Sequence, residues 1–305
     1  MGEPVTKLQA RLGDRVRLQE PLSRHTTWCI GGPADVMVFP ATADHVALAW
    51  EWARASNLPW VVIGNGSNIL VADDGFRGMV IKIGHGLRQW RLEGSALIAQ
   101  AGVPLPLLVR RTAAAGLSGI EFAAGIPATV GGACVMNAGA FGHSMGERVA
   151  SVKVLGPGQD IRVLSRHEVE FSYRRSSLGE GNLAVVEVTL ELIPEAPAVV
   201  TGRVNEWRRE RARRQPLRYP SAGSVFINPP GYAAGWLLEQ AGAKGMGCGG
   251  AQVSRQHANF IINRGGATAR DVEELMARMQ DMVYRRFGII LEAEIRRLGT
   301  RPERG

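Results

Sequence analysis

Residues 116–142 read GLSGIEFAAGIPATVGGACVMNAGAFG and contain seven glycines but only one charged residue, Glu121. Glycine lets the backbone adopt positive φ and approach a ligand closely. This stretch is therefore either a cradle for a ligand or a tightly packed, turn-rich part of the core. A second glycine-rich loop, 64–68 (GNGSN), lies between two apolar runs. Two such loops suit a dinucleotide, because successive backbone N–H groups form an anion-binding concavity.

The sequence lacks the motifs of other nucleotide-binding sites and of metal sites. The loop 64–68 is followed by Ile69 where a G-x-G-x-x-G fingerprint needs glycine, and the chain has no G-x-x-x-x-G-K-[ST] motif. The six histidines and three cysteines lack metal-ligand spacing, so we expect no metal. We expect Pro127 to preset the first turn of a helix over 128–138, whose N-terminus would favour phosphate.

Length and composition indicate a soluble globular protein of two or three domains, with 305 residues, 45% of them hydrophobic and 21% charged. No apolar run is long enough to cross a membrane, and the N-terminus lacks the apolar segment of a secretory signal. These features favour the cytoplasm. The three separate cysteines, Cys29, Cys134 and Cys248, are expected to be small buried hydrophobes and not disulfides.

A net charge of +8 and a sequence pI near 10.0 raise nucleic acid as a partner. Seven arginines fall in 203–218, which is either a solvated helix face or an anion site. Only 6% of the residues are aromatic, and the arginine-rich stretch lacks an interleaved platform of aromatic residues on which bases could stack. We therefore expect no nucleic acid partner.

The periodicity of the chain predicts an α+β protein. Predicted helices cover 43–56, 105–115, 203–218, 232–241 and 268–287, the last beginning with a capping box of Thr268 and Asp271. Predicted strands cover 60–63, 69–71, 78–83, 96–101, 152–155, 161–164, 183–192 and 290–298, with a hairpin turn at 156–160.

Five motifs in order along the chain carry a resemblance. They are GNGSNILV (64–71), GIEFAAGIPATVGGACVMNAGAFG (119–142), SYRRSSL (172–178), YPSAGSVFINP (219–229) and LEAEIR (291–296). Together they resemble the UDP-N-acetylenolpyruvoylglucosamine reductase family, whose members complete UDP-N-acetylmuramate for peptidoglycan. The resemblance implies an FAD-binding fold of the vanillyl-alcohol-oxidase type, with two FAD subdomains at 1–83 and 84–197 and a substrate domain at 198–305, with the strand 290–298 contributing to the active site.

The resemblance also implies FAD and NADPH as cofactors and a monomer acting on small molecules in the cytoplasm, without membrane insertion. Hydride passes from NADPH to FAD and then to C3 of the enolpyruvyl group, and C2 takes a proton. The residues implied to line the FAD are Ile63, Gly64, Asn65, Gly66, Ser67, Asn68, Gly125, Ile126, Pro127, Thr129, Val130, Gly131, Gly132, Asn137, Ala138 and Gly139.

Three residues carry the implied chemistry. By resemblance Ser224 donates the proton, Arg174 holds the substrate carboxylate, and Glu294 orients or polarises the enol. We expect Arg174 on a strand, where its neighbour Arg175 would point the other way, and Glu292 is the alternative to Glu294. On residues alone, the commoner interpretation is that Ser224 is a turn residue, Arg174 a surface arginine and Glu294 part of a solvated face.

Implied substrate contacts are Tyr173, Arg211, Arg214, Asn228, His257 and Arg296. His257 stands where we expect glutamine in the better-known branch. The fifty residues from Arg174 to Ser224 leave no room for the tyrosine-bearing loop of one branch, so the chain resembles the branch without it. A different flavin oxidase of the same fold is the alternative function, although it leaves the Arg174, Ser224 and Glu294 set unexplained.

Overall fold

The structure is a computed structural model that describes residues 2–156, 160–179 and 183–299. The described chain divides into two compact units. The first unit contains residues 2–18, 36–65 and 78–210, and the second contains 19–35, 66–77 and 211–299. Neither unit is one continuous stretch of sequence, and each is described by itself.

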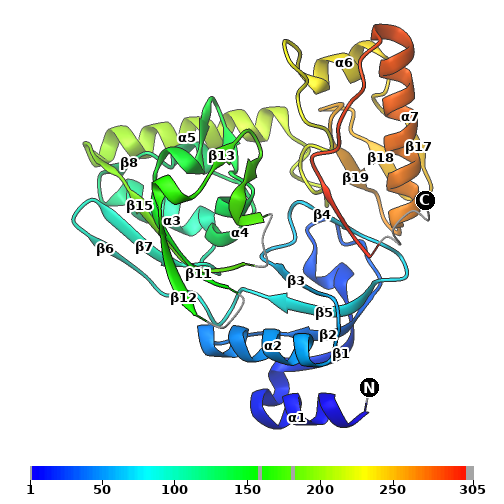
Figure 1. The fold of residues 1–305 in the computed structure, drawn as a ribbon. Coiled ribbons are helices and arrows are strands. Elements are labelled where there is room, and N and C mark those ends of the chain that lie inside the picture. The colour runs from blue at the N-terminus through cyan, green and yellow to red at the C-terminus, as the bar shows by residue number, and fades with distance from the viewer. Residues whose placement is uncertain (1, 157–159, 180–182, 300–305) are drawn as a thin grey trace. The chain divides into compact units, whose positions relative to one another are not determined.

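A five-stranded antiparallel sheet forms the centre of the first unit (Figure 1). Its strands, in spatial order, are β12 (Ile161–Ser165), β11 (Val149–Leu155), β15 (Ala184–Glu191), β7 (Ala96–Gln100) and β6 (Trp90–Glu93). Alternate residues such as Leu97 and Ala99 are buried, while Ile98 and Gln100 between them are partly exposed. One face of this sheet therefore packs into a core, as its period-2 pattern predicts.

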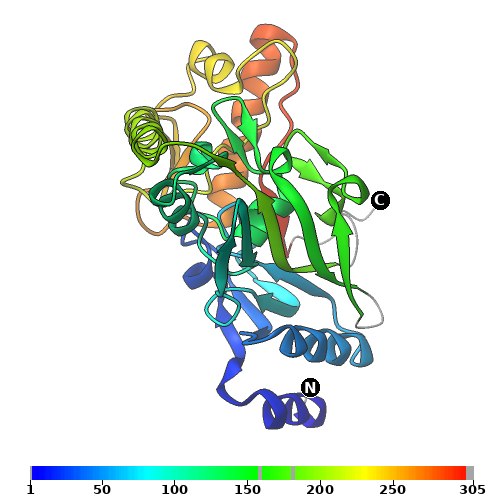
Figure 2. The ribbon, with the colours of Figure 1, turned by 90° about the vertical axis from the view of Figure 1, so that its left-hand side faces the viewer.

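Helices supply the rest of that core. The helices of the first unit are α1 (Gly2–Leu12), α2 (Ala43–Ala55), α3 (Leu105–Ala114), α4 (Val130–Val135) and most of α5 (Pro197–Arg214). Figure 2 shows α5 nearly end-on beside the sheet. Buried residues of α3 and α4, including Leu108 and Val130, belong to the same apolar cluster as Leu97. The predicted helices at 43–56 and 105–115 and the predicted hairpin of β11 and β12 are confirmed, although 157–159 of its turn lie outside the described residues.

A second sheet positions one of the glycine-rich loops. Its order is β1 (Val16–Pro21), β2 (Pro33–Val38), β5 (Phe76–Lys82) and β3 (Trp60–Ile63), and the unit boundaries fall within β1, β2 and β5. Strands β3 and β5 are parallel, with Ile63 opposite Lys82. Because parallel strands end at the same edge, Lys82 lies beside the start of the loop 64–68.

Three short antiparallel pairs complete the first unit. They are β8 (Leu117–Ser118) with β16 (Ile193–Pro194), β9 (Gly139–Ala140) with β10 (His143–Ser144), and β13 (Phe171–Ser172) with β14 (Arg175–Ser176).

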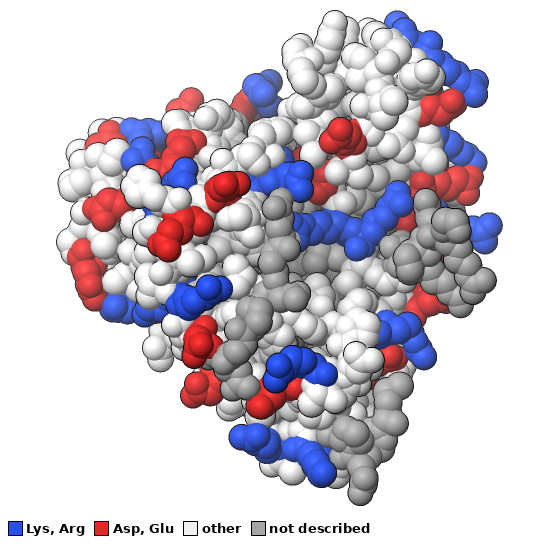
Figure 3. Space-filling view, viewed as in Figure 1, with Lys and Arg blue, Asp and Glu red and all other residues white. Residues whose placement is uncertain are grey.

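The second unit is built around the helix α7 (Ala269–Phe287), with its own apolar cluster. The capping box of Thr268 and Asp271 is confirmed, and Gly288 ends the helix with φ of 69°. The remaining elements are α6 (Ala234–Gln240), the three-stranded sheet of β17 (Gly247–Cys248), β18 (Ala251–Val253) and β19 (Ile261–Asn263), and the parallel pair β4 (Ile69–Val71) and β20 (Arg296–Leu298). Figure 3 shows basic and acidic groups side by side along α7, where Arg285 pairs with Asp281 at 2.9 Å.

The predicted strand 290–298 is shorter than expected, because a regular ladder forms only over β20. Residues 290–295 have a single bridge, between Ala293 and Phe226. The backbone opposite residues 290–295, around Phe226, is irregular and not a strand, so no longer ladder forms there. Among the described residues no helix is long and apolar enough to cross a membrane, and no group of three or more His, Cys, Asp or Glu could hold a metal ion.

Candidate active site

The loop 64–68 exposes backbone donors. The carbonyl of Gly64 accepts from Lys82 Nζ at 2.6 Å, and the carbonyl of Gly66 accepts from the Thr27 N–H at 3.2 Å. Within the described ranges, no protein acceptor takes any of the five N–H groups of this loop. A peptide plane is trans, so fixing each carbonyl directs the following N–H, of Asn65 or Ser67, the opposite way. The loop is thus suited to bind an anion.

The loop 125–132 uses its donors differently. Val130 and Gly131 donate their N–H groups to the carbonyls of Val103 and Ala101, and the Gly132 N–H bonds Thr129 Oγ1. Helix α4 begins at Val130, with Thr129 as its N-cap, so the prediction that Pro127 forms the first helical turn is wrong. The donors at the start of this six-residue helix are already satisfied inside the protein, which leaves no phosphate site there.

Close packing explains the glycine of this second loop. A Cβ on Gly131 would lie 2.6 Å from the Ala101 Cβ. The two loops also contact each other, because Asn65 Nδ2 donates to the Pro127 carbonyl at 2.7 Å and a Cβ on Gly64 would lie 2.4 Å from Thr129 Oγ1. The second loop therefore packs against residues 64 and 65, at the start of the first loop.

Strained backbone surrounds Arg174. Tyr173 and Arg174 form the two-residue turn between β13 and β14, so the prediction that Arg174 lies on a strand is wrong. Arg174 has φ of 60°, and its Nη1 donates to the Gly139 carbonyl at 2.7 Å. Asn137 has φ of 42° and bonds the Ser172 carbonyl and the Gly146 N–H through its side chain. Left-handed non-glycine residues cost about 1–3 kcal/mol each and cluster at functional sites.

Ser224 lies in the second unit on a segment, 221–228, whose backbone is held on both sides. The Val225 N–H donates to the Asn259 carbonyl at 2.9 Å. The buried Asn259 side chain accepts from the Phe226 N–H at 3.0 Å and donates to the Phe226 carbonyl at 2.8 Å. Nothing in the described part of the chain hydrogen-bonds the Ser224 hydroxyl, which is partly exposed. The segment presents this hydroxyl on a fixed backbone.

Glu294 lies directly beside that segment. Its N–H donates to the Val225 carbonyl at 2.8 Å, and its own carbonyl accepts from Asn68 Nδ2 at 3.1 Å. Glu294 is half-buried, whereas Glu292 and Arg296 are exposed. The structure therefore places the Glu294 backbone against Val225, the residue after Ser224, whereas the Glu292 carbonyl accepts from the Ile227 N–H two residues further along.

Of the predicted substrate contacts of the second unit, Arg214 lies close enough to His257 for their charges to interact. The Nδ1 of His257 accepts from the Asn259 N–H at 3.2 Å, so in the neutral ring the proton is on Nε2. Burial, with a further effect of Lys244 and Arg214, lowers the pKa of His257 below its ordinary value of 6.5. Arg211 is buried at the end of α5 and bonds Gln215 at 3.1 Å, and Asn228 Oδ1 accepts from the Ala234 N–H at the start of α6.

The predictions from sequence missed two residues, Lys82 and Asn259. Lys82 has a weak signal, since it is one of four lysines in an arginine-rich chain and ends the apolar run of β5. Asn259 has none, because its partners lie 33 residues away in the sequence.

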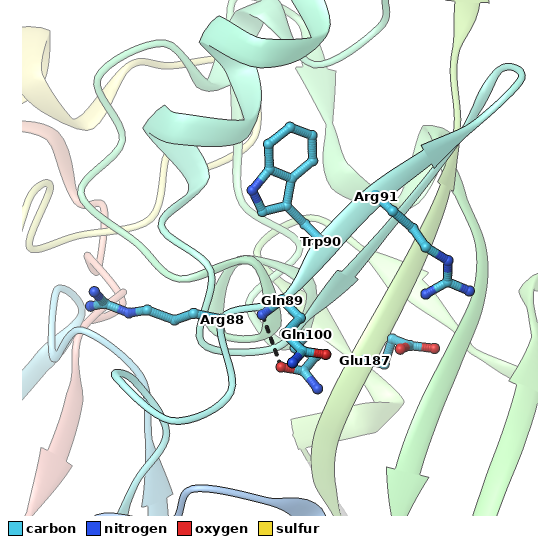
Figure 4. A pocket seen from close by; sticks show the side chains of 6 residues that line it. All are labelled: Arg88, Gln89, Trp90, Arg91, Gln100 and Glu187. Atoms are coloured by element: carbon cyan, nitrogen blue, oxygen red, sulfur yellow. Dashed lines mark hydrogen bonds between the residues drawn. The ribbon is translucent and has the colours of Figure 1, made fainter.

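A cavity of about 420 Å³ lies on the open face of the five-stranded sheet and contains none of the predicted site residues. Figure 4 shows Arg91, Gln100 and Glu187 lining it, while the Trp90 ring points to the other side of β6. Two of its three charged residues pair within the sheet, Arg91 with Glu93 and Glu187 with Lys153, Arg88 being the third, and we assign no ligand to it.

Comparison with known proteins decides the family. A family model for the C-terminal domain of UDP-N-acetylenolpyruvoylglucosamine reductase matches residues 215–298, and an FAD-binding-domain model matches 34–165. The UDP-N-acetylenolpyruvoylglucosamine reductase of Moorella thermoacetica is 49% identical over 292 residues, which are 95% of each chain. The chain belongs to the UDP-N-acetylenolpyruvoylglucosamine reductase family. The homologue of Heliobacterium modesticaldum is 47% identical, over 92% of this chain and 90% of that one.

Solved structures agree with this family. The crystal structure of the UDP-N-acetylenolpyruvylglucosamine reductase of Thermus caldophilus superimposes with a TM-score of 0.80 and 38% identity, covering 93% of this chain and 98% of that one. An alkyldihydroxyacetonephosphate synthase, 16% identical over 64% of this chain and 41% of its own, has a TM-score of 0.50 and shows the shared fold alone. The predicted α+β, FAD-binding fold of the vanillyl-alcohol-oxidase type is thus confirmed, and the family uses FAD and NADPH.

Proposed function

We propose that this protein is a UDP-N-acetylmuramate dehydrogenase, which reduces UDP-N-acetylglucosamine enolpyruvate to UDP-N-acetylmuramate with NADPH and FAD for peptidoglycan synthesis. The observation that carries this proposal is the segment 221–228, whose backbone is held by hydrogen bonds, because it presents the Ser224 hydroxyl while its Val225 carbonyl accepts from the N–H of the half-buried Glu294. Family membership over nearly the whole chain supports the same substrate.

The loop 64–68 fits the diphosphate of FAD, because it has unmatched N–H donors and a lysine beneath it. We propose that FAD is held by the residues expected from the sequence, although the two loops have different roles in holding it. Residues 64–68 would supply backbone donors, whereas Thr129, Val130, Gly131 and Gly132 would shape the support behind them. Asn137, Ala138 and Gly139 would follow in the strained loop.

The bound flavin supplies hydride transfer, from NADPH to C3 of the enolpyruvyl group. Ser224 would give the proton to C2 through its hydroxyl. Addition to an enol ether carboxylate builds negative charge on the carboxylate, and Arg174 would bind that charge with its guanidinium. The hydrogen bond from Arg174 Nη1 to the Gly139 carbonyl supports this role, because a side chain held in place before the reaction needs less reorganisation during it. Glu294 would orient the enol or the proton donor.

The sugar nucleotide would contact Tyr173, Asn228 and Arg296, together with the basic residues Arg211, Arg214 and His257. The Nε2–H of His257 is a suitable donor to phosphate oxygen, as are the two guanidinium groups. We further propose that the protein acts in the cytoplasm and as a monomer. Sedimentation at the working concentration tests the oligomeric state.

Reduction of the bound flavin tests the function. The purified protein should be yellow, and NADPH should bleach it in the absence of oxygen. Mixing NADPH and UDP-N-acetylglucosamine enolpyruvate should yield UDP-N-acetylmuramate, identified by a mass increase of two hydrogens. A colourless protein that cannot be reconstituted with FAD would rule out the proposal. A yellow protein that oxidises alcohols or sugars and not this substrate would indicate a different flavin oxidase.

A further inference from the structure

Lys82 has no role among the residues discussed for the chemistry, yet it occupies an unusual place. It ends β5, is partly buried, and donates from Nζ to the Gly64 carbonyl at 2.6 Å. Burial, with a smaller effect of the nearby Arg88, lowers the pKa of Lys82 from 10.5 to about 8. At neutral pH most of the molecules therefore keep a positive charge in a place where burial disfavours it.

The contact of Lys82 fixes one peptide plane. The Gly64–Asn65 peptide is trans, so its carbonyl and its N–H point in opposite directions. With the carbonyl held by Lys82, the Asn65 N–H must point away from Nζ, toward the side of the loop where donors lack protein acceptors. A free loop would exchange between peptide orientations, and ordering it would reduce the affinity for any ligand.

The register of the sheet makes this placement specific. Lys82 faces Gly64 because Ile63 pairs with Lys82 in the parallel ladder. Thr129 Oγ1 lies close on one side of Gly64, since a Cβ there would be 2.4 Å from it. The Asn65 side chain is tied to the Pro127 carbonyl. Three separate contacts thus fix the start of the loop, and Lys82 is the one that adds charge.

We propose that Lys82 is a positioning residue for cofactor binding, which orients the Gly64–Asn65 peptide and places a positive charge beneath the loop that receives the FAD diphosphate. This inference rests on the proposed cofactor role of residues 64–68. It explains why a cation is kept at a site where an apolar side chain would be easier to bury, because charged hydrogen bonds to the backbone are strong where the surroundings are partly dry.

The test replaces Lys82 and measures FAD binding and apo-protein stability together. Lys82→Met fills the same space without charge or donor, and its dissociation constant for FAD, measured by flavin fluorescence, should rise about 10- to 100-fold. The urea midpoint of the apo-protein should stay level or rise, because a buried charge has been removed. Lys82→Arg restores the charge and the donor and should recover most of the affinity.

Lys153→Met is the matched control, since Lys153 lies on β11 of the same unit and pairs with Glu187 at 2.7 Å. Its affinity for FAD should equal that of the unmodified protein. The inference is overturned if Lys82→Met binds FAD within twofold of the unmodified protein. It is also overturned if lost affinity comes with a lower urea midpoint of the apo-protein, because Lys82 would then support the fold. Absence of FAD binding by the unmodified protein would instead contradict the proposed function.

Discussion

The loop 64–68 and the segment 221–228 are both irregular, and they use their backbones in opposite ways. In the loop, carbonyls are held by protein donors while N–H groups lack protein acceptors within the described residues. In the segment, the N–H groups of Val225, Phe226 and Ile227 all have acceptors, while the Ser224 hydroxyl has no hydrogen-bond partner in the described chain. The first leaves backbone donors available for a ligand, and the second carries a side chain on a fixed backbone.

This difference explains how binding and chemistry can be separated in one chain. Backbone donors recognise a phosphate group without demanding a particular side chain. A proton donor must keep one hydroxyl within reach of one carbon atom, so its backbone must not move. Changes to the loop should therefore alter cofactor affinity, and changes to the segment should alter the reaction.

The largest effect is expected for Ser224→Ala. Loss of a positioned proton donor typically slows a reaction by about 10²- to 10⁴-fold. Reoxidation of the reduced flavin by substrate should slow by that factor, while flavin reduction by NADPH and the FAD dissociation constant should be unchanged. Stopped-flow absorbance measures both half-reactions. Ser221→Ala, in the same segment, is the control and should leave both rates near normal. If Ser224→Ala slowed both half-reactions equally, Ser224 would have another role.

Asn259→Ala tests whether the backbone of the segment must be fixed. It leaves the buried N–H and carbonyl of Phe226 without partners, which should lower the free energy of unfolding by about 2–4 kcal/mol. Urea titration measures this loss, and substrate reduction should fall while FAD affinity holds. Asn205→Ala, on the exposed face of α5, should change the free energy of unfolding by less than about 0.5 kcal/mol. Full activity in Asn259→Ala would show that the segment needs no such support.

Asn65→Ala addresses the loop itself. It removes the hydrogen bond to the Pro127 carbonyl, a contribution of about 0.5–1.5 kcal/mol, and should weaken FAD roughly 3- to 10-fold. Reoxidation of the flavin that remains bound should proceed at the normal rate. Fluorescence titration gives the affinity for FAD. Slower reoxidation of the FAD-saturated variant would contradict the idea that the loop affects binding and not the reaction.

The smallest effect concerns His257 and pH. Its pKa is lowered in the folded protein, so the unfolded chain binds more protons over the interval between that lowered value and about 6.5. Stability should therefore fall as pH drops through 6.5. His257→Gln should reduce this slope, measured as the urea midpoint from pH 7.5 to pH 5. An unchanged slope would place the titrating group elsewhere.

Local patterns predicted the local structure. The helices α2 and α3 and the capping box of α7 follow from spacing within a few residues. Loop 64–68 could be identified from its glycines and its place between apolar runs. Three other features could not be predicted: the short length of β20, the turn at Arg174, and the hydrogen bonds that already occupy the N–H donors at the start of α4. Each of them depends on which backbone segment lies opposite. Lys82 and Asn259 were missed for the same reason. The role of Lys82 depends on strand register, and that of Asn259 depends on contacts with a residue 33 positions away, and neither can be recognised in the sequence.

Reoxidation of the NADPH-bleached protein by UDP-N-acetylglucosamine enolpyruvate, followed anaerobically through flavin absorbance beside Ser224→Ala, tests the central claim most directly. The unmodified protein should regain its yellow colour once, with one UDP-N-acetylmuramate formed per flavin. Ser224→Ala should bleach normally and stay bleached on that time scale. The account would be contradicted if the substrate left both proteins bleached, or if both regained colour at the same rate.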